Sequence, residues 1–108
     1  MMPEFLIAFC TFPSLDVATN VTKEMVKAGL VACGNILPKI HSIYRWEGKL
    51  ESNDEVLAIF KLAGHRYAEF EDRLRNMHPY EVPEIIAMPV THALPAYLEW
   101  VKESCGEL

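Results

Sequence analysis

This sequence lacks the features that mark several common protein classes. It has no run of basic residues, and its net charge of −5 at pH 7 disfavours nucleic acid as the main partner and mildly favours a cationic ligand. No stretch approaches the roughly 20 apolar residues of a membrane-spanning helix, so we expect no membrane partner. The first residues lack the basic leader and the small-residue cleavage site of a signal peptide.

Cysteine is scarce and its spacing is unpaired. Cys10, Cys33 and Cys105 are odd in number, and no CxxC or HxxxH motif indicates a dedicated zinc site. Free thiols are typical of the reducing cytosol, which is therefore the expected compartment. A glycine-rich phosphate loop and a nucleophile elbow are also missing, so a nucleotide site is weakly supported and an enzyme is not expected.

Apolar material, by contrast, is sufficient for one core. The 108 residues are 51% hydrophobic and 23% charged, which is ordinary for a globular protein. We therefore expect residues 1–108 to form a single domain without repeats or linkers.

A long antiparallel hairpin over residues 30–62 is the most distinctive predicted element. Its outgoing arm is rich in β-branched and aromatic residues, and the chain reverses at Glu47-Gly48-Lys49. The returning arm is a short apolar run over 55–62, the pattern of a buried strand. Pro38 requires a bulge or an edge position in the outgoing arm.

The outgoing arm is apolar on both faces. Ile40, Tyr44 and Trp46 share one face, and Ile43 lies on the other. A small domain has one core, so a strand of this kind needs a second surface to pack against. We predict that this surface belongs to another copy of the chain.

The remaining elements complete an α+β pattern. A strand over 4–11 has a continuous apolar run over 5–9 and is expected to be central and buried on both faces, and a helix follows from an N-cap at Ser14 to a stop at Gly29. After the hairpin come a helix over 64–77, a strand over 82–90 and a short helix over 95–103. The order is that of the ferredoxin-like βαββαβ sandwich with an extra C-terminal helix.

This topology gathers chemically capable residues where the first strand ends. Cys10 and His78 are expected to meet there, and a thiolate with an imidazole suits a soft or borderline cation such as copper or zinc. Glu81, Glu84 or Met77 could complete the coordination shell. In the competing interpretation the cysteine is a small core residue and the histidine a loop residue.

Two further chemistries fit this end of the fold less well. Cys10 could act as a nucleophile with His78 as its base, but no third orienting group is visible. An anion could bind at the start of the first helix with Lys61 and Arg45, although no phosphate loop precedes that helix.

Several longer strings resemble the CutA family of divalent-cation-tolerance proteins. They run in order along nearly the whole chain, as ACGNILP, IHSIYRWEGKLE, EVLAIFK, HPYEVPEIIAMPV and YLEW. The resemblance implies a ferredoxin-like fold, a tight homotrimer whose hairpins pack between subunits, and binding of divalent metal, chiefly copper. By position it implies Cys10 and His78 as metal ligands, with Met77 where similar bacterial proteins have a second histidine.

The CutA family is similar to PII-type signalling proteins in its trimeric architecture, and this similarity implies a rival function. A small ligand would bind in a cleft between subunits, where we place Tyr44, Trp46, Lys61, His78 and Glu84. A third interpretation is a stable structural trimer that serves protein interaction.

Overall fold

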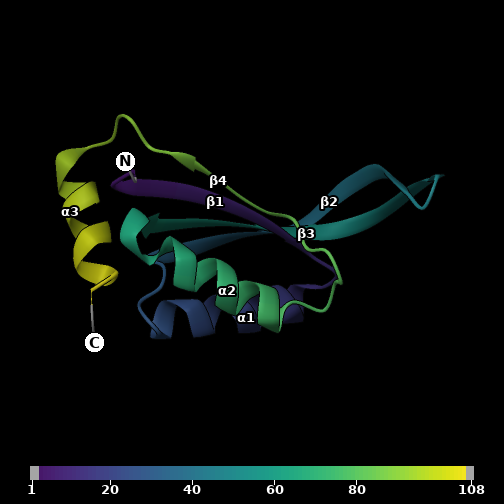
Figure 1. Ribbon diagram of the computed structural model, residues 1–108, viewed down its shortest axis with the longest axis horizontal. Helices are drawn as coiled ribbons and strands as arrows, with labels where there is room; N and C mark the ends of the chain where they lie inside the picture. Colours follow the sequence, from purple (N-terminus) through teal and green to yellow (C-terminus); the bar gives the residue numbers. More distant parts are fainter. Residues whose placement is uncertain (1–2, 107–108) are drawn as a thin grey trace.

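A four-stranded antiparallel sheet in the order β2-β3-β1-β4 forms the main layer of the computed structural model, which describes residues 3–106 (Figure 1). Helices α1 and α2 cover one face of the sheet, and α3 lies at the end where β1 begins (Figure 1). In chain order the elements are β1 Phe5–Phe12, α1 Leu15–Lys27, β2 Cys33–Trp46, β3 Lys49–Ala63, a 3₁₀ turn Gly64–Arg66, α2 Tyr67–Met77, β4 Ile85–Pro89 and α3 Pro95–Ser104. The predicted α+β, ferredoxin-like arrangement is confirmed.

Local signals set most of the boundaries. The Ser14 side chain accepts a hydrogen bond from the Val17 amide at 3.2 Å, and Gly29, with φ of 69°, stops α1 as expected. The register of β2 against β3 shifts between Leu37 and Ile40, which is the bulge that Pro38 requires.

Two predicted strands differ in length from those observed. The returning arm begins at Lys49 rather than at residue 55, because its polar residues 51–54 pair with β2 through the backbone ladder, which is indifferent to hydropathy. The last strand starts at Ile85 rather than at residue 82, and the segment with Pro83, which has no amide proton to donate, remains a loop.

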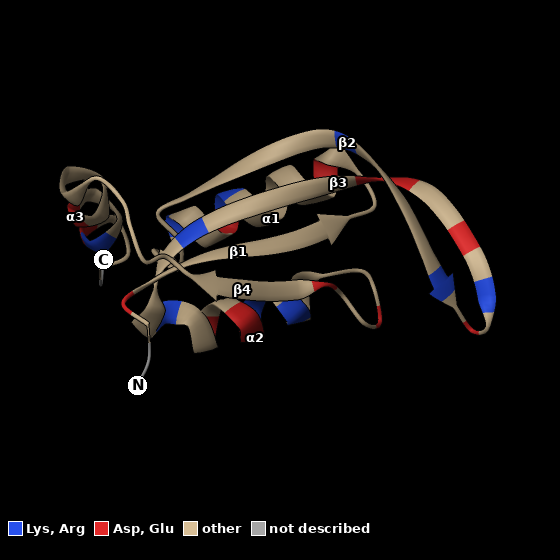
Figure 2. Ribbon diagram, turned by 90° about the horizontal axis from the view of Figure 1, so that it is seen from above, with Lys and Arg blue, Asp and Glu red and all other residues tan. Residues whose placement is uncertain are grey.

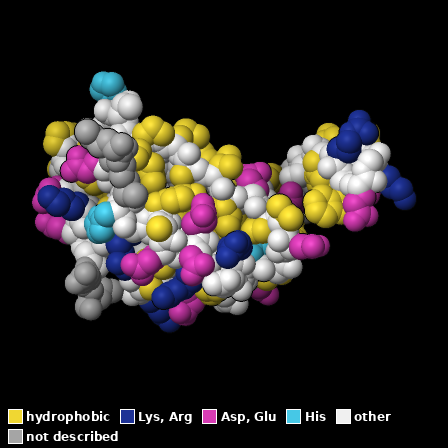
Figure 3. All heavy atoms as spheres, viewed as in Figure 1, with side chains coloured by type: hydrophobic (Ala, Val, Ile, Leu, Met, Phe, Trp, Pro, Cys, Tyr) yellow, Lys and Arg dark blue, Asp and Glu magenta, His cyan; other side chains and the backbone are white. Residues whose placement is uncertain are grey.

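The hairpin extends beyond the rest of the sheet. Glu47 and Gly48 both have positive φ values, 50° and 80°, as a two-residue hairpin turn requires. Because β1 ends at Phe12, opposite Val56, residues of β3 before Val56 pair with β2 alone (Figure 2). In Figure 3 this two-stranded ribbon is a lobe that stands apart from the main body and carries both apolar and charged side chains.

The core lies between the sheet and helices α1 and α2. Leu6, Ala8, Cys10 and Phe12 alternate along β1 and are buried on this face. The expectation that β1 is buried on both faces is wrong for the single chain, since Phe5, Ile7 and Phe9 on the other face are only half-buried. Met77 follows the buried Phe70 and Leu74 at the spacing of one helical face, but its side chain is 38% exposed at the last helical position.

The opposite face of the sheet is largely apolar, and neither α1 nor α2 covers it, while α3 reaches it at the end where β1 begins (Figure 1). The cross-strand pairs place residues from all four strands on this open face: Leu37, Leu57, Ile59, Phe9, Ile86 and Met88. None of the described helices is both long enough and apolar enough to cross a membrane.

Candidate functional site

His78 is held firmly by backbone groups at the end of β1. Its Nε2 lies 2.7 Å from the carbonyl oxygen of Thr11, and its Nδ1 accepts a hydrogen bond from the Tyr80 amide at 3.1 Å. Since Nδ1 accepts, Nε2 carries the proton and donates to Thr11. The ring stacks on Phe12 with centroids 4.8 Å apart and is buried. Burial lowers the pKa of His78, so the imidazole is neutral at physiological pH.

Cys10 lies beside this histidine but points into the core. It is 0% exposed, and burial first, then the carboxylates of Glu84 and Glu55, raise the pKa of the thiol to about 12. Its Sγ lies 3.7 Å from the same Thr11 carbonyl oxygen that His78 contacts. The structure therefore brings Cys10 and His78 together, as the sequence predicts, with the thiol in its protonated form.

The donors at this end, as they stand, do not fit a tightly held ion. Cys10 keeps its proton, and both ring nitrogens of His78 are engaged by the backbone. In the described part of the chain, no group of three or more His, Cys, Asp or Glu side chains is arranged to hold a metal. The same contacts leave His78 without a nitrogen to activate Cys10 as a nucleophile.

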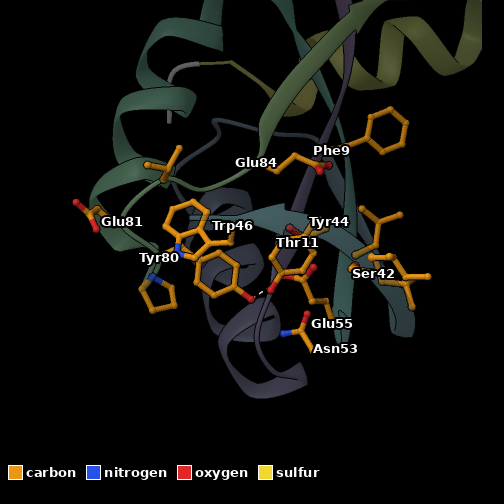
Figure 4. A pocket seen from close by; sticks show the side chains of 15 residues that line it. Phe9, Thr11, Ser42, Tyr44, Trp46, Asn53, Glu55, Tyr80, Glu81 and Glu84 are labelled. Atoms are coloured by element: carbon orange, nitrogen blue, oxygen red, sulfur yellow. Dashed lines mark hydrogen bonds between the residues drawn. The ribbon is translucent and has the colours of Figure 1, made fainter. Parts of the chain in front are cut away.

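A groove of about 830 Å³ opens next to His78. One wall is the hairpin, from Ile40 to Trp46 on β2 and from Asn53 to Leu57 on β3, and the other is the loop 79–84. Tyr44, Trp46 and Glu84, which the sequence placed in a ligand cleft, line this groove together (Figure 4).

Glu55 and Tyr80 join the two walls of the groove. The Tyr80 hydroxyl donates a 2.7 Å hydrogen bond to Oε2 of Glu55, which is buried (Figure 4). Burial, followed by this hydrogen bond, raises the pKa of Tyr80 well above its usual value. The Tyr80 ring also lies 4.7 Å from that of His78, centroid to centroid, so Tyr80 connects the histidine to the groove. Sequence reasoning missed this pair, although an acid opening the apolar run 55–62 was a signal for Glu55.

Lys61 does not lie with the other predicted cleft residues. It is near the end of β3, opposite Cys33, whereas Tyr44 and Trp46 are on the projecting arm of β2. There it hydrogen-bonds Asn35 and lines a separate cavity of about 170 Å³ beside α3. Within one chain the register along β3 therefore separates Lys61 from these residues, and their grouping in a cleft between subunits stays a prediction.

Known proteins resemble this chain over nearly its full length. The profile of a family described as "CutA1 divalent ion tolerance protein" matches residues 6–104. The "Divalent-cation tolerance protein CutA" of Thermus thermophilus is 38% identical over 100 residues, which is 93% of this chain and 97% of that protein. "Protein CutA" of Homo sapiens is 42% identical over 96 residues, which is 89% of this chain but 54% of that longer protein.

Solved structures share the fold of this chain over nearly its full length. The structure of the "Periplasmic divalent cation tolerance protein CutA" from Archaeoglobus fulgidus superposes with a TM-score of 0.91 at 34% identity. The match covers 94% of this chain and 99% of that one.

Proposed function

Because this chain belongs to the CutA1 family of divalent ion tolerance proteins, we propose that it acts in divalent-cation tolerance as a homotrimer that binds a divalent metal, copper in particular, with low affinity. Cys10 and His78 are the ligands in this proposal. The observation that carries it is that the thiol sulfur and the imidazole Nε2 contact one backbone oxygen, that of Thr11. An ion that took the place of the Thr11 oxygen would contact the sulfur of Cys10, a soft donor, and the imidazole of His78, a borderline donor.

The low affinity follows from what the ion must displace. Raising the pKa of Cys10 from 9.0 to about 12 corresponds to about 4 kcal/mol against the thiolate that a metal requires. His78 must also give up a backbone hydrogen bond. Met77, exposed on the last turn of α2, offers a thioether that suits Cu(I) better than Cu(II) or Zn(II).

The uncovered surfaces of the chain support the homotrimer. Ile86 on the open face is 53% exposed, and Leu50 near the tip of the ribbon is 75% exposed. The outer edges of β2 and β4 are also free to pair with other strands, since no strand of the described chain lies beyond them. Large apolar patches and open sheet edges are both covered most simply by further copies of the chain.

The metal proposal is tested by calorimetric titration of the reduced protein with Cu(I), Cu(II) and Zn(II). The test variant is Cys10→Ser/His78→Ala, and the control is Cys33→Ser/His92→Ala, which changes the same residue types at the opposite end of the sheet. We expect binding at a fixed ratio per subunit that only the first variant loses, with the oligomer mass unchanged in both. Equal binding by wild type and both variants would rule out the Cys10–His78 site.

A second candidate function is small-ligand binding with a signalling role, as in PII-type proteins. The groove favours it, because about 830 Å³ lies in the range of roughly 300–1,000 Å³ typical of ligand sites. Ligand binding in this case would survive Cys10→Ser but fail with Trp46→Leu. A structural trimer would bind neither metal nor ligand, and would lose its assembly when Tyr44 or Trp46 is truncated.

We expect no catalysed reaction. We also propose the cytosol as the compartment, because all three cysteines are unpaired in the structure, as is typical of a reducing environment. The similar archaeal protein described as periplasmic makes this proposal worth a direct check. Cell fractionation, with a free-thiol assay on the protein isolated without reductant, would provide it.

A further inference from the structure

The groove beside the hairpin has a one-sided charge. Its charged lining residues are Glu55, Glu81 and Glu84, and no lysine, arginine or histidine of the described chain lines it. They come from both walls, since Glu55 belongs to β3 and the other two to the loop 79–84. An anionic ligand would therefore meet like charges on both sides, whereas a cation would meet opposite ones.

Aromatic rings stand between these carboxylates. Tyr44 and Trp46 are two residues apart on β2 and so lie on the same face of the ribbon, and Tyr80 faces them from the loop (Figure 4). Trp46 is 47% exposed, so much of its ring is accessible. The faces of such rings attract cations that are weakly hydrated.

The rest of the lining is mostly apolar. Phe9 and Leu57 come from neighbouring strands, Ile40 and Ile43 from β2 and Val82 from the loop, while the polar residues Thr11, Ser42 and Asn53 carry no charge. The aliphatic side chains pack well against alkyl groups, and no three acidic, histidine or cysteine side chains of the described residues are arranged to hold a metal ion. Charge, aromatic faces and aliphatic walls thus point to the same class of ligand.

We propose that the groove binds a small organic cation, an ammonium bearing alkyl groups, with the charge between Glu55 and Glu84 and the alkyl groups against Trp46 and Tyr44. This inference rests on the second function proposed above, ligand binding in the groove, and is independent of the Cys10–His78 metal site. The hairpin tip of a neighbouring copy, which carries Arg45 and Lys49, is the competing occupant.

Three probes of similar shape separate charge from size. Choline carries a positive charge, 3,3-dimethylbutan-1-ol is its neutral isostere, and 3,3-dimethylbutanoate is an anion. Titrated into the intact oligomer by calorimetry, choline should bind with a Kd about tenfold lower than the neutral alcohol, and the anion should not bind measurably.

Matched variants locate the site. Trp46→Leu and Glu84→Gln should each weaken choline binding about tenfold. Trp100→Leu and Glu99→Gln, on α3 and outside the groove lining, should leave it unchanged. Because the sequence has two tryptophans, Trp46 is the sole fluorophore of that kind in Trp100→Leu, and its emission should change on choline binding.

The remaining outcomes separate the class of ligand from the location of its site. Equal binding of choline and the neutral alcohol, lost in Trp46→Leu, would keep ligand binding in the groove but refute the cation class. Choline binding that persists in Trp46→Leu and Glu84→Gln would refute the groove as its site. No binding of any probe by the oligomer would overturn both statements, and would be the result expected if a neighbouring hairpin fills the groove.

Discussion

Cys10 should be alkylated far more slowly in the folded protein than in the unfolded chain. The reactive species is the thiolate, and at pH 8 a thiol of pKa 9.0 is about one-tenth ionised. With the pKa raised to about 12, the ionised fraction falls to about one in ten thousand. Ionisation alone therefore slows the reaction about a thousandfold, before the full burial of the side chain is considered.

The assay is iodoacetamide labelling followed by peptide mass spectrometry, with and without denaturant. Cys33, which is half-buried, should label first in the native protein, whereas Cys10 and Cys105, both 0% exposed, should label at the rate of unfolding or local opening. Native Cys10 that labels within tenfold of its unfolded rate would refute both the raised pKa and the proposed reason for weak metal affinity.

The same thiol makes stability depend on alkaline pH. The pKa of Cys10 is higher in the folded state than in the unfolded one, so the stability is at its full value below pH 9, where the thiol is protonated in both states. As pH rises from 9 toward about 12, the unfolded chain loses a proton that the folded one keeps, so stability falls. Cys10→Ala should flatten this fall in denaturant titrations, and an unchanged slope would contradict the assignment.

Three other substitutions test the fold and the assembly. Ser14→Ala removes the cap of α1 and should lower the free energy of unfolding by about 1 kcal/mol, as measured by urea titration. A decrease of less than a few tenths of a kcal/mol would mean that the cap does not contribute to stability. Tyr80→Phe leaves the buried carboxylate of Glu55 without its donor and should cost about 1–3 kcal/mol; a neutral result would show that water replaces the hydroxyl. Ile86→Lys on the open face should reduce the oligomer mass in light scattering, while Val26→Lys on the outer side of α1 should not, and a monomeric wild type would remove the basis of this test.

Local chemistry made much of the fold predictable from sequence. The cap at Ser14, the turn at Gly48, the bulge at Pro38 and the end of α2 before Pro79 each depend on a residue and its near neighbours. The order of the elements then restricted the topology to one arrangement, which brought Cys10 close to residue 78.

The features that sequence reasoning missed depend on where elements end in space. Periodicity places Met77 on the same face of α2 as the buried Leu74. It does not show where the layer packed against that face ends, and Met77 lies beyond this end and is exposed to solvent. Lys61 lies apart from Tyr44 and Trp46 within one chain, because hydropathy does not measure distance along a strand. Pairing of Glu55 with Tyr80 required the register of β3 and the path of a loop together, neither of which a linear pattern contains.

If the chain assembles as proposed, the ribbon at the end of the hairpin makes folding and association one process for part of the chain. A two-stranded antiparallel ribbon is at best marginally stable in water, and among residues 3–106 the segment 40–55 has no strand partner outside itself. In the proposed homotrimer, neighbouring subunits would supply the remaining stability of this segment, so its order would depend on protein concentration. On dilution the amide hydrogens of this segment should exchange before those of β1, and a protease should cut there first. Protein concentration would thus set the fraction of molecules in which the hairpin wall of the groove is ordered, while the core would stay folded at any concentration.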